Sequence, residues 1–219
     1  MTCNLLRLRK SNRIFFSALL MRESICSKMK EEAISNRVTV ATWSLNESGR
    51  WRNNMVTQET GLTAGRVLDE LKKCGATHIV WLPDTKTRFI YEAMMSQKEI
   101  TLVPFCREGE GVAIAAGLIL GGKKPVVVYQ NTGLYEAGDS IRCVALELRL
   151  PLLMMIGYLG WRRDSPITDS AGIFLEPTLD AWGIKYYLVE ADEDVEKISI
   201  GDKQARETNR PVAILIATE

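Results

Sequence analysis

One glutamate opens the stretch of the chain whose residue types are best suited to chemistry. Glu108 follows a short apolar segment and begins the run EGEGVAIAAGLIL, and Gly117 lies nine positions after it. A carboxyl group can hold or transfer a proton when its surroundings control its charge. A glutamate at the start of a helix is, however, more often a surface residue that the helix dipole favours. Position alone therefore favours a surface role for Glu108.

Other polar residues follow apolar segments and are further candidates for a binding site. Asn131 and Thr132 come after the run VVVYQ, where they could touch a ligand, although simple turn formation explains them equally well. Arg162 and Arg163 could bind an acidic group, although a solvated loop is the more common role for such a pair. Cys106 lies near Glu108, but nothing in the sequence marks it as a nucleophile.

The elements that must position these residues follow a regular alternation from Thr63 onwards. Short apolar runs predict strands at residues 78–82, 100–103, 125–129, 152–156, 185–189 and 212–217. Helical spacing of apolar residues predicts helices at residues 63–75, 85–96, 108–120, 134–148, 175–182 and 195–208. Strands that are apolar throughout indicate an α/β fold with a mostly parallel sheet and helices on both faces.

In such a sheet, ligands bind beyond the carboxyl ends of the strands. This rule selects four loops, at residues 83–84, 106–108, 130–133 and 158–163. His78 is the only histidine and begins a strand, so we expect it at the opposite edge of the sheet. A single histidine also excludes any metal site that needs two.

The composition limits the classes of partner. The chain has 219 residues and a formal net charge of +1, which gives no electrostatic reason to expect a nucleic acid partner. Its longest apolar runs are too short to span a bilayer, so no membrane partner is expected. The five cysteines include no CxxC pair, which favours reduced thiols in the cytoplasm over a disulfide framework or a zinc site.

Residues 1–54 differ in composition from the rest of the chain. Five basic residues precede the first acidic one, Glu23: Arg7, Arg9, Lys10, Arg13 and Arg22. A signal or transit peptide could have this composition. A poorly ordered extension, or translation from upstream of a true start at Met55, is the better interpretation. We therefore expect an extension at residues 1–54 and one domain at residues 55–219.

The sequence around Glu108 resembles a known cofactor-binding domain. A strand, then Arg107 and Glu108, then a small-residue helix with Gly117 and the run GKKPVVV is similar to the pyrimidine-binding domain of thiamine-diphosphate enzymes. The longer stretches HIVWLPDTKTRFIYEAM, LVPFCREGEGVAIAAG, KKPVVVYQNTGL and LPLLMMIGYLGW resemble the alpha subunit of sulfopyruvate decarboxylases and the matching half of phosphonopyruvate decarboxylases. The resemblance runs from about Leu62 to the C-terminus.

This resemblance implies a catalytic role for Glu108. In the family, the glutamate contacts N1′ of the cofactor's aminopyrimidine and favours the imino tautomer, which removes the thiazolium C2 proton before a 2-oxo acid is decarboxylated. Glu108 would have to stay protonated near neutral pH for this purpose. We expect Pro83, Asp84, Asn131 and Thr132, which follow two other strands, to contact the thiamine diphosphate as well.

The chain also departs from the family pattern. Many members have histidine where this chain has Arg107. We expect Arg107 to point either away from Glu108 or toward the acidic group of the substrate, for which it is a candidate beside the later arginine pair. In closer members the segment after the VVV strand reads similarly to QNSG followed by Leu-Gly-Asn. Here it reads QNTGLYEAGDSIR, so Tyr135, Glu136 and Asp139 depart from that pattern. This leaves the substrate open among 3-sulfo, 3-phosphono and related 2-oxo acids. Glu110 lacks the spacing to Gly117 and is a secondary candidate.

One family motif is missing. The diphosphate and Mg²⁺ site of the family is a Gly-Asp-Gly with an asparagine some tens of residues later, and this chain has no Gly-Asp-Gly. We therefore expect no metal site on this chain and a beta-type partner subunit that carries it, in a hetero-oligomer. The resemblance further implies a place in coenzyme M biosynthesis. A carboligase or oxidoreductase subunit, or a non-catalytic interaction module with the same fold, are the alternatives.

Overall fold

The computed structural model describes residues 37–45, 51–59 and 61–218, and the chain divides into two compact units, Met1–Glu59 and Thr60–Glu219. In the first unit, β1 (Arg37–Leu45) pairs antiparallel with β2 (Trp51–Glu59). The sequence analysis expected no strand here, and its boundary between residues 54 and 55 falls inside β2. The extension expected at residues 1–36 and 46–50 lies outside the described residues.

The second unit contains a six-stranded sheet in which every neighbouring pair of strands is parallel. The strands lie side by side in the order β4-β3-β5-β6-β8-β7. Their bounds are His78–Trp81 (β3), Thr101–Pro104 (β4), Pro125–Gln130 (β5), Leu153–Gly157 (β6), Lys185–Val189 (β7) and Val212–Ile216 (β8). The expected α/β fold with a parallel sheet is confirmed.

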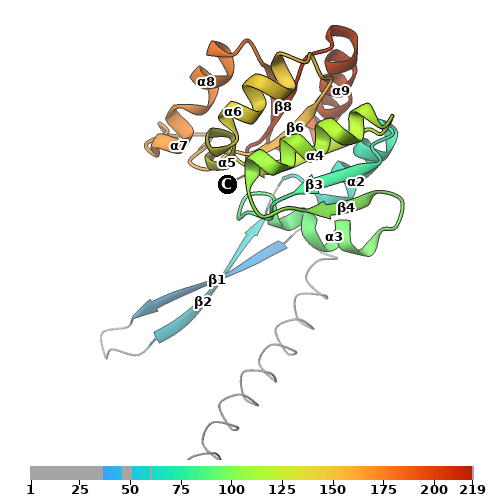
Figure 1. The fold of residues 1–219 in the computed structure, drawn as a ribbon. Helices are drawn as coiled ribbons and strands as arrows, with labels where there is room; N and C mark the ends of the chain where they lie inside the picture. The colour runs from blue at the N-terminus through green and yellow to red at the C-terminus, as the bar shows by residue number, and fades with distance from the viewer. Residues whose placement is uncertain (1–36, 46–50, 60, 219) are drawn as a thin grey trace, which may run out of the picture. The chain divides into compact units, whose positions relative to one another are not determined.

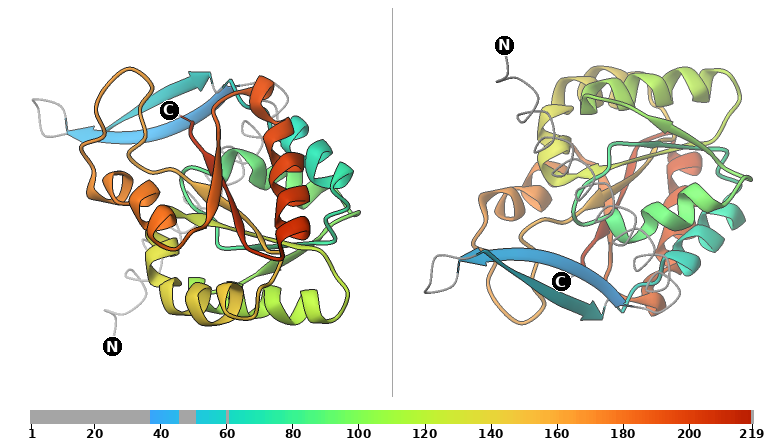
Figure 2. Two further views of the ribbon diagram at one scale, coloured as in Figure 1. Left: turned by 90° about the horizontal axis from the view of Figure 1, so that it is seen from above. Right: turned by 90° about the horizontal axis from the view of Figure 1, so that it is seen from below.

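Helices cover both faces of this sheet, as the two views in Figure 2 show (helix labels in Figure 1). One hydrophobic cluster takes its buried helical residues from α4, α5, η2 and α8, and the other takes them from α2, η1, α3 and α9. The helical segments are Ala64–Lys73 (α2), Arg88–Ile90 (η1), Tyr91–Ser96 (α3), Glu108–Leu120 (α4), Asn131–Glu136 (α5), Gly138–Ser140 (α6), Ile141–Leu146 (η2), Ser170–Ile173 (α7), Leu175–Ala181 (α8), Asp192–Asp194 (η3) and Glu196–Thr208 (α9). Among these segments, none is long and apolar enough to cross a membrane.

The central strand β5 shows why the strands read as continuous apolar runs. Successive side chains of a strand point to opposite faces of a sheet. Val127 and Tyr129 pack in one hydrophobic cluster, and Val126 and Val128 pack in the other. Because both faces are covered, neither set of alternate positions can be polar.

Two predicted helices begin at different residues from those expected. The helix expected at residues 85–96 begins only at Arg88, because Asp84 holds the preceding turn. Its Oδ1 accepts hydrogen bonds from the backbone nitrogens of Lys86, at 2.7 Å, and Thr87, at 3.0 Å. The helix expected at residues 134–148 begins instead at Asn131 and continues as α5, α6 and the π-helix η2. Residues 131–133 are therefore the first turn of a helix, and the expected loop at residues 130–133 was wrong.

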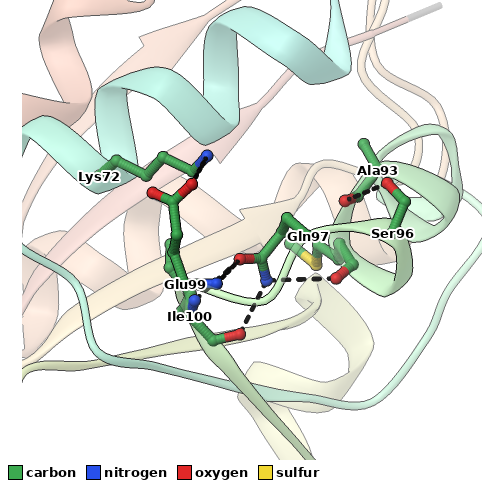
Figure 3. Close-up of polar contacts among 7 residues, drawn as sticks. Lys72, Ala93, Ser96, Gln97, Glu99 and Ile100 are labelled. Atoms are coloured by element: carbon green, nitrogen blue, oxygen red, sulfur yellow. Dashed lines mark hydrogen bonds and ion pairs between the residues drawn. The ribbon is translucent and has the colours of Figure 1, made fainter.

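The connection from α3 to β4 is closed by one side chain (Figure 3). Gln97 donates from Nε2 to the carbonyl oxygens of Met94 and Ile100, and its Oε1 accepts from the backbone nitrogens of Glu99 and Ile100. Lys72 on α2 adds an ion pair of 2.9 Å with Glu99. These contacts fix the start of β4. Because β4 is short, they also fix the position at which the chain leaves its carboxyl end and enters α4.

We predict that a chain beginning at Thr60 folds without the preceding residues. The described buried side chains of both hydrophobic clusters come from residues 62–217, and the cut removes none of these. A start at Met55, which composition suggested, would divide β2 and is the less informative cut. Circular dichroism during heating should show a cooperative transition like that of the full-length chain. A chain that is insoluble or unfolded, when the full-length protein is folded, would contradict this prediction.

Candidate active site

Several predicted site residues follow β3 and β5, two neighbouring strands whose outgoing connections cross the sheet in opposite directions. The strand β3 leads through α3 to β4 at one edge of the sheet, whereas its neighbour β5 leads through α5 to β6 on the other side. In parallel α/β sheets, ligands bind beyond the carboxyl ends of the strands at such a point. His78 begins β3 and pairs with the first residues of β4 and β5, so it lies at the amino edge, as expected.

Glu108 is the first residue of α4 and packs directly on α5. It is partly buried, and a Cβ atom added at Gly133 would lie 2.5 Å from its Cγ and 2.8 Å from its Oε1. Burial raises the pKa of Tyr129 near the end of β5, and the charge of Glu108 raises it further. The carboxyl group of Glu108 therefore lies near the carboxyl end of the central strand, in the space that the missing side chain of Gly133 leaves.

The start of α4 is held by a residue of α5. Glu136 accepts a hydrogen bond from the backbone nitrogen of Gly109 at 2.9 Å on one carboxylate oxygen, and it pairs with Nε of Arg107 through the other. The hydrogen bond from Arg107, followed by that from Gly109, lowers the pKa of Glu136. Glu110, the alternative candidate, is exposed, and its Oε2 accepts from the backbone nitrogen of Cys106 at 3.4 Å.

Pro83 and Asp84 follow β3 directly. Pro83 is exposed, whereas both carboxylate oxygens of Asp84 are bonded within the chain: Oδ2 accepts from the hydroxyl of Thr87 at 2.5 Å, and Oδ1 accepts from two backbone nitrogens. A Cβ at Gly157 would lie 2.9 Å from Asp84 Oδ1, so this loop packs against the end of β6. Asp84 thus shapes the loop after β3.

Asn131 and Thr132 begin α5 but differ in exposure. Asn131 is fully buried, and its Nδ2 donates to the carbonyl oxygens of Leu159 and Ala171, each at 2.9 Å. Thr132 is exposed, and its hydroxyl donates to Oε1 of Gln130 at 3.1 Å. The buried amide of Asn131 therefore ties the segment after β6 to the start of α5.

Arg162 and Arg163 are exposed residues of the segment between β6 and α7. Arg163 donates from Nε to Oε1 of Glu190 at 3.2 Å, just after β7. The strand β7 is the edge strand at the opposite end of the sheet from β4, after which Glu108 lies. This hydrogen bond of Arg163 therefore lies toward the β7 edge of the sheet.

Sequence reasoning did not assign a role to Gly133 or Glu136, which contact the start of α4. They lie three residues apart on α5 and so share one helical face. The departure of Glu136 from the family pattern was visible in the sequence. Its contact with the start of α4 was not visible, because the predicted helix began after Gly133 and did not put these two residues on one helical face.

The comparison with known proteins agrees with this arrangement. Residues 63–155 match the family model described as "Thiamine pyrophosphate enzyme, N-terminal TPP binding domain". This part of the chain is similar to the N-terminal, cofactor-binding domain of the thiamine-pyrophosphate enzymes.

Similar proteins extend beyond the matched domain. The sulfopyruvate decarboxylase subunit alpha of Methanocaldococcus jannaschii is 26% identical over 151 residues, which cover 68% of this chain and 89% of that protein. The same subunit of Methanococcus maripaludis is 25% identical over 145 residues, which cover 65% of this chain and 86% of that protein. The sulfopyruvate decarboxylase of Methanosarcina acetivorans is 22% identical over 153 residues, which cover 69% of this chain and 39% of that protein.

The residues present suit the pyrimidine end of the cofactor. Glu108 offers a carboxyl group near the buried side chain of Tyr129, and Gly133 leaves room for it. In residues 61–218, by contrast, there is no group of three or more His, Cys, Asp or Glu side chains that could hold a metal ion. The described part of this site could thus hold an aminopyrimidine ring, and it offers no such cluster for the Mg²⁺ that accompanies the diphosphate.

We predict that Asn131→Ala loosens the segment that follows β6. The substitution leaves the carbonyl oxygens of Leu159 and Ala171 without their amide donor, at a cost of about 1–3 kcal/mol. Amide hydrogen exchange should become faster across residues 158–172, and the thermal midpoint should fall. Thr132→Ala is the matched control, because that side chain is exposed and its hydroxyl bonds to the neighbouring Gln130. Equal exchange in the two variants would show that Asn131 does not hold this segment.

Proposed function

We propose that this chain is the alpha-type subunit of a thiamine-diphosphate-dependent 2-oxo acid decarboxylase. The observation that carries the proposal is the placement of Glu108 beyond the end of β5, inside a domain similar to that of the thiamine-pyrophosphate enzymes. The three relatives named above are sulfopyruvate decarboxylases or their alpha subunits, which supports a 3-sulfo or chemically similar 3-phosphono 2-oxo acid as substrate. With the sulfo acid, the subunit would serve coenzyme M biosynthesis.

Glu108 has one task in this proposal, which is to hold a proton at N1′ of the aminopyrimidine. When bound, the cofactor supplies a thiazolium that accepts the electrons released as CO₂ leaves the 2-oxo acid. The buried residues beside Glu108 exclude water on the side of this chain, and the face of the carboxyl group away from α5 is left for the cofactor. We expect Pro83 and Thr132, both exposed, to contact the cofactor. We assign Asp84 and Asn131 the task of shaping the loops around it.

The acidic group of the substrate requires a cation. The charge of Arg107 is already paired with Glu136, which favours a role in holding α4 over contact with the substrate. Arg162 and Arg163 remain the candidates on this chain, because the segment that carries them is tied to α5 by Asn131. Arg163 would have to exchange its pairing with Glu190 for the substrate. Their pairing with a sulfonate or phosphonate would be charge-assisted and therefore strong.

A beta-type partner subunit would complete the site, in a hetero-oligomer. The exposed face of α4 supports this part of the proposal: Ala113, Gly117 and Leu120 are exposed, and no charged residue follows Glu110 in the helix. Leu120 is 77% exposed. A surface helix usually shows a charged stripe on its outer face. The partner would cover this face and bring the diphosphate and Mg²⁺ site that the chain lacks.

We place the complex in the cytoplasm. The three cysteines in the described part of the chain, Cys74, Cys106 and Cys143, are free thiols. Free thiols without disulfides are typical of a reducing compartment.

Glu108→Gln tests the function directly. The chain is co-expressed with its candidate partner, and CO₂ release is measured from 3-sulfopyruvate, 3-phosphonopyruvate and pyruvate. Activity should fall by about 10²–10⁴-fold, since this is the usual loss when a positioned acid is removed. Glu110→Gln is the matched control two residues away and should keep its activity. Loss of activity only in Glu110→Gln would give the catalytic role to the other glutamate.

Two alanines of α4 separate assembly from folding. Ala113 is exposed on the outer face, whereas Ala116 is only 6% exposed and faces the chain's own core. We expect Ala113→Glu to fold as a single chain but to lose pairing, because the partner would have to bury an unpaired carboxylate. We expect Ala116→Glu to disrupt folding itself.

Size-exclusion chromatography with light scattering, on chains co-expressed with the partner, measures both effects. A stable interface of this kind buries about 2,000 Å² or more. If the substitution prevents pairing, the measured mass should fall from that of the complex to that of the separate chains. If the Ala113→Glu chain still forms the full complex, the partner does not cover this face.

A further inference from the structure

The first turn of α4 has no cap of its own. The N-cap residue is Arg107, whose side chain makes no capping hydrogen bond. The first backbone N–H groups of a helix need acceptors, and the positive end of the helix dipole favours an acidic partner. Glu136 of α5 supplies this acceptor from 27 residues away in the sequence, at 2.9 Å from the nitrogen of Gly109.

Residues of α5 contact Glu108 and both of its neighbours in the sequence. Glu136 binds the residue before it, through Arg107 Nε, and the residue after it, through the nitrogen of Gly109. One turn earlier, Gly133 lies directly against the side chain of Glu108 itself. Figure 1 shows the short helix α5 beside the first turn of α4. Two residues of α5 thus contact three successive residues, which are the N-cap of α4 and the first two residues of the helix.

The contact also controls charge. The pKa of Glu136 is lowered, first by the hydrogen bond from Arg107 and then by that from Gly109, so its carboxylate stays ionised at neutral pH. Arg107 is the immediate neighbour of Glu108, and this carboxylate neutralises it. The same side chain therefore caps the helix and removes an unpaired cation from beside the candidate catalytic acid.

We propose that Glu136 is a positioning residue that sets the place of Glu108, with Gly133 as the surface on which that side chain rests. The proposal rests on the proposed function, because it gives Glu136 a task only if Glu108 contacts the cofactor. A misplacement of about 1 Å in a catalytic group can cost about 10²-fold in rate. A carboxylate that fixes the turn bearing Glu108 therefore has a direct effect on the reaction.

The first experiment uses the full-length chain without cofactor or partner. Amide hydrogen exchange is measured in the wild type and in Glu136→Ala, Glu136→Gln and a control, Glu147→Ala. The control removes another exposed glutamate that pairs with an arginine, Arg142, at 2.6 Å. Glu136→Ala should speed exchange at Gly109 and the residues beside it, Glu136→Gln should do so less because it keeps an acceptor, and the control should not. Unchanged exchange at Gly109 in Glu136→Ala overturns the proposal, whatever the activity.

The second experiment measures kcat and KM in the complex with the partner. Glu136→Ala and Gly133→Ala should lower kcat by about 10²-fold, the loss expected from a displaced catalytic group, while KM changes little. Partial recovery in Glu136→Gln supports positioning over general destabilisation, which would lower the thermal midpoint and the amount of active complex instead. Gly65→Ala is the control for the added methyl group, because that helical glycine has open space around it. A normal kcat in Glu136→Ala beside faster exchange at Gly109 overturns the proposal. An inactive wild-type complex counts against the proposed function, and the exchange result then decides the role of Glu136 separately.

Discussion

The burial of β5 on both faces is the constraint on which the rest of the second unit depends. This strand lies between β3 and β6, and the exposed fraction of each of its residues Val126 to Tyr129 is 3% or less. Such a strand needs a helical layer on each side, since buried backbone and apolar side chains must be kept from water. The layer formed by α4, α5 and η2 meets this need on one face. That layer also brings the start of α4 and the start of α5 together beyond the end of β5.

The candidate site follows from this meeting of two helices. Glu108 begins one of them, and Gly133 and Glu136 belong to the other, so neither helix alone defines the position of the carboxyl group. The small residues on the inner side of α4, such as Gly111, Ala115 and Ala116, let it approach the sheet and its neighbour closely. A Cβ at Gly111 would lie 2.8 Å from the ring of Phe105, which shows how close this approach is.

The same helix has two faces with different surroundings. Its inner face packs in the core of the second unit, while its outer face presents Ala113, Gly117 and Leu120 without charge. The proposed partner subunit would explain why this helix carries an uncovered apolar face next to the candidate catalytic residue. A site shared between chains would be formed only on assembly, which would make the catalytic reaction a property of the complex.

The sequence by itself determined most elements of the second unit, because hydrophobic periodicity is a local property. The bounds of α4 and β7 were predicted to the residue, and all six parallel strands were found within two residues. The spacing from Glu108 to Gly117, with the resemblance around it, was sufficient to select the candidate catalytic residue. Only the tertiary structure showed that Asn131 is a buried tether, that Arg107 is paired with Glu136, and that Ala116 faces inward while Ala113 faces outward. These properties depend on side chains that meet across tens of residues of sequence. Their geometry is set by how the two helices pack on the sheet, and no local pattern records it.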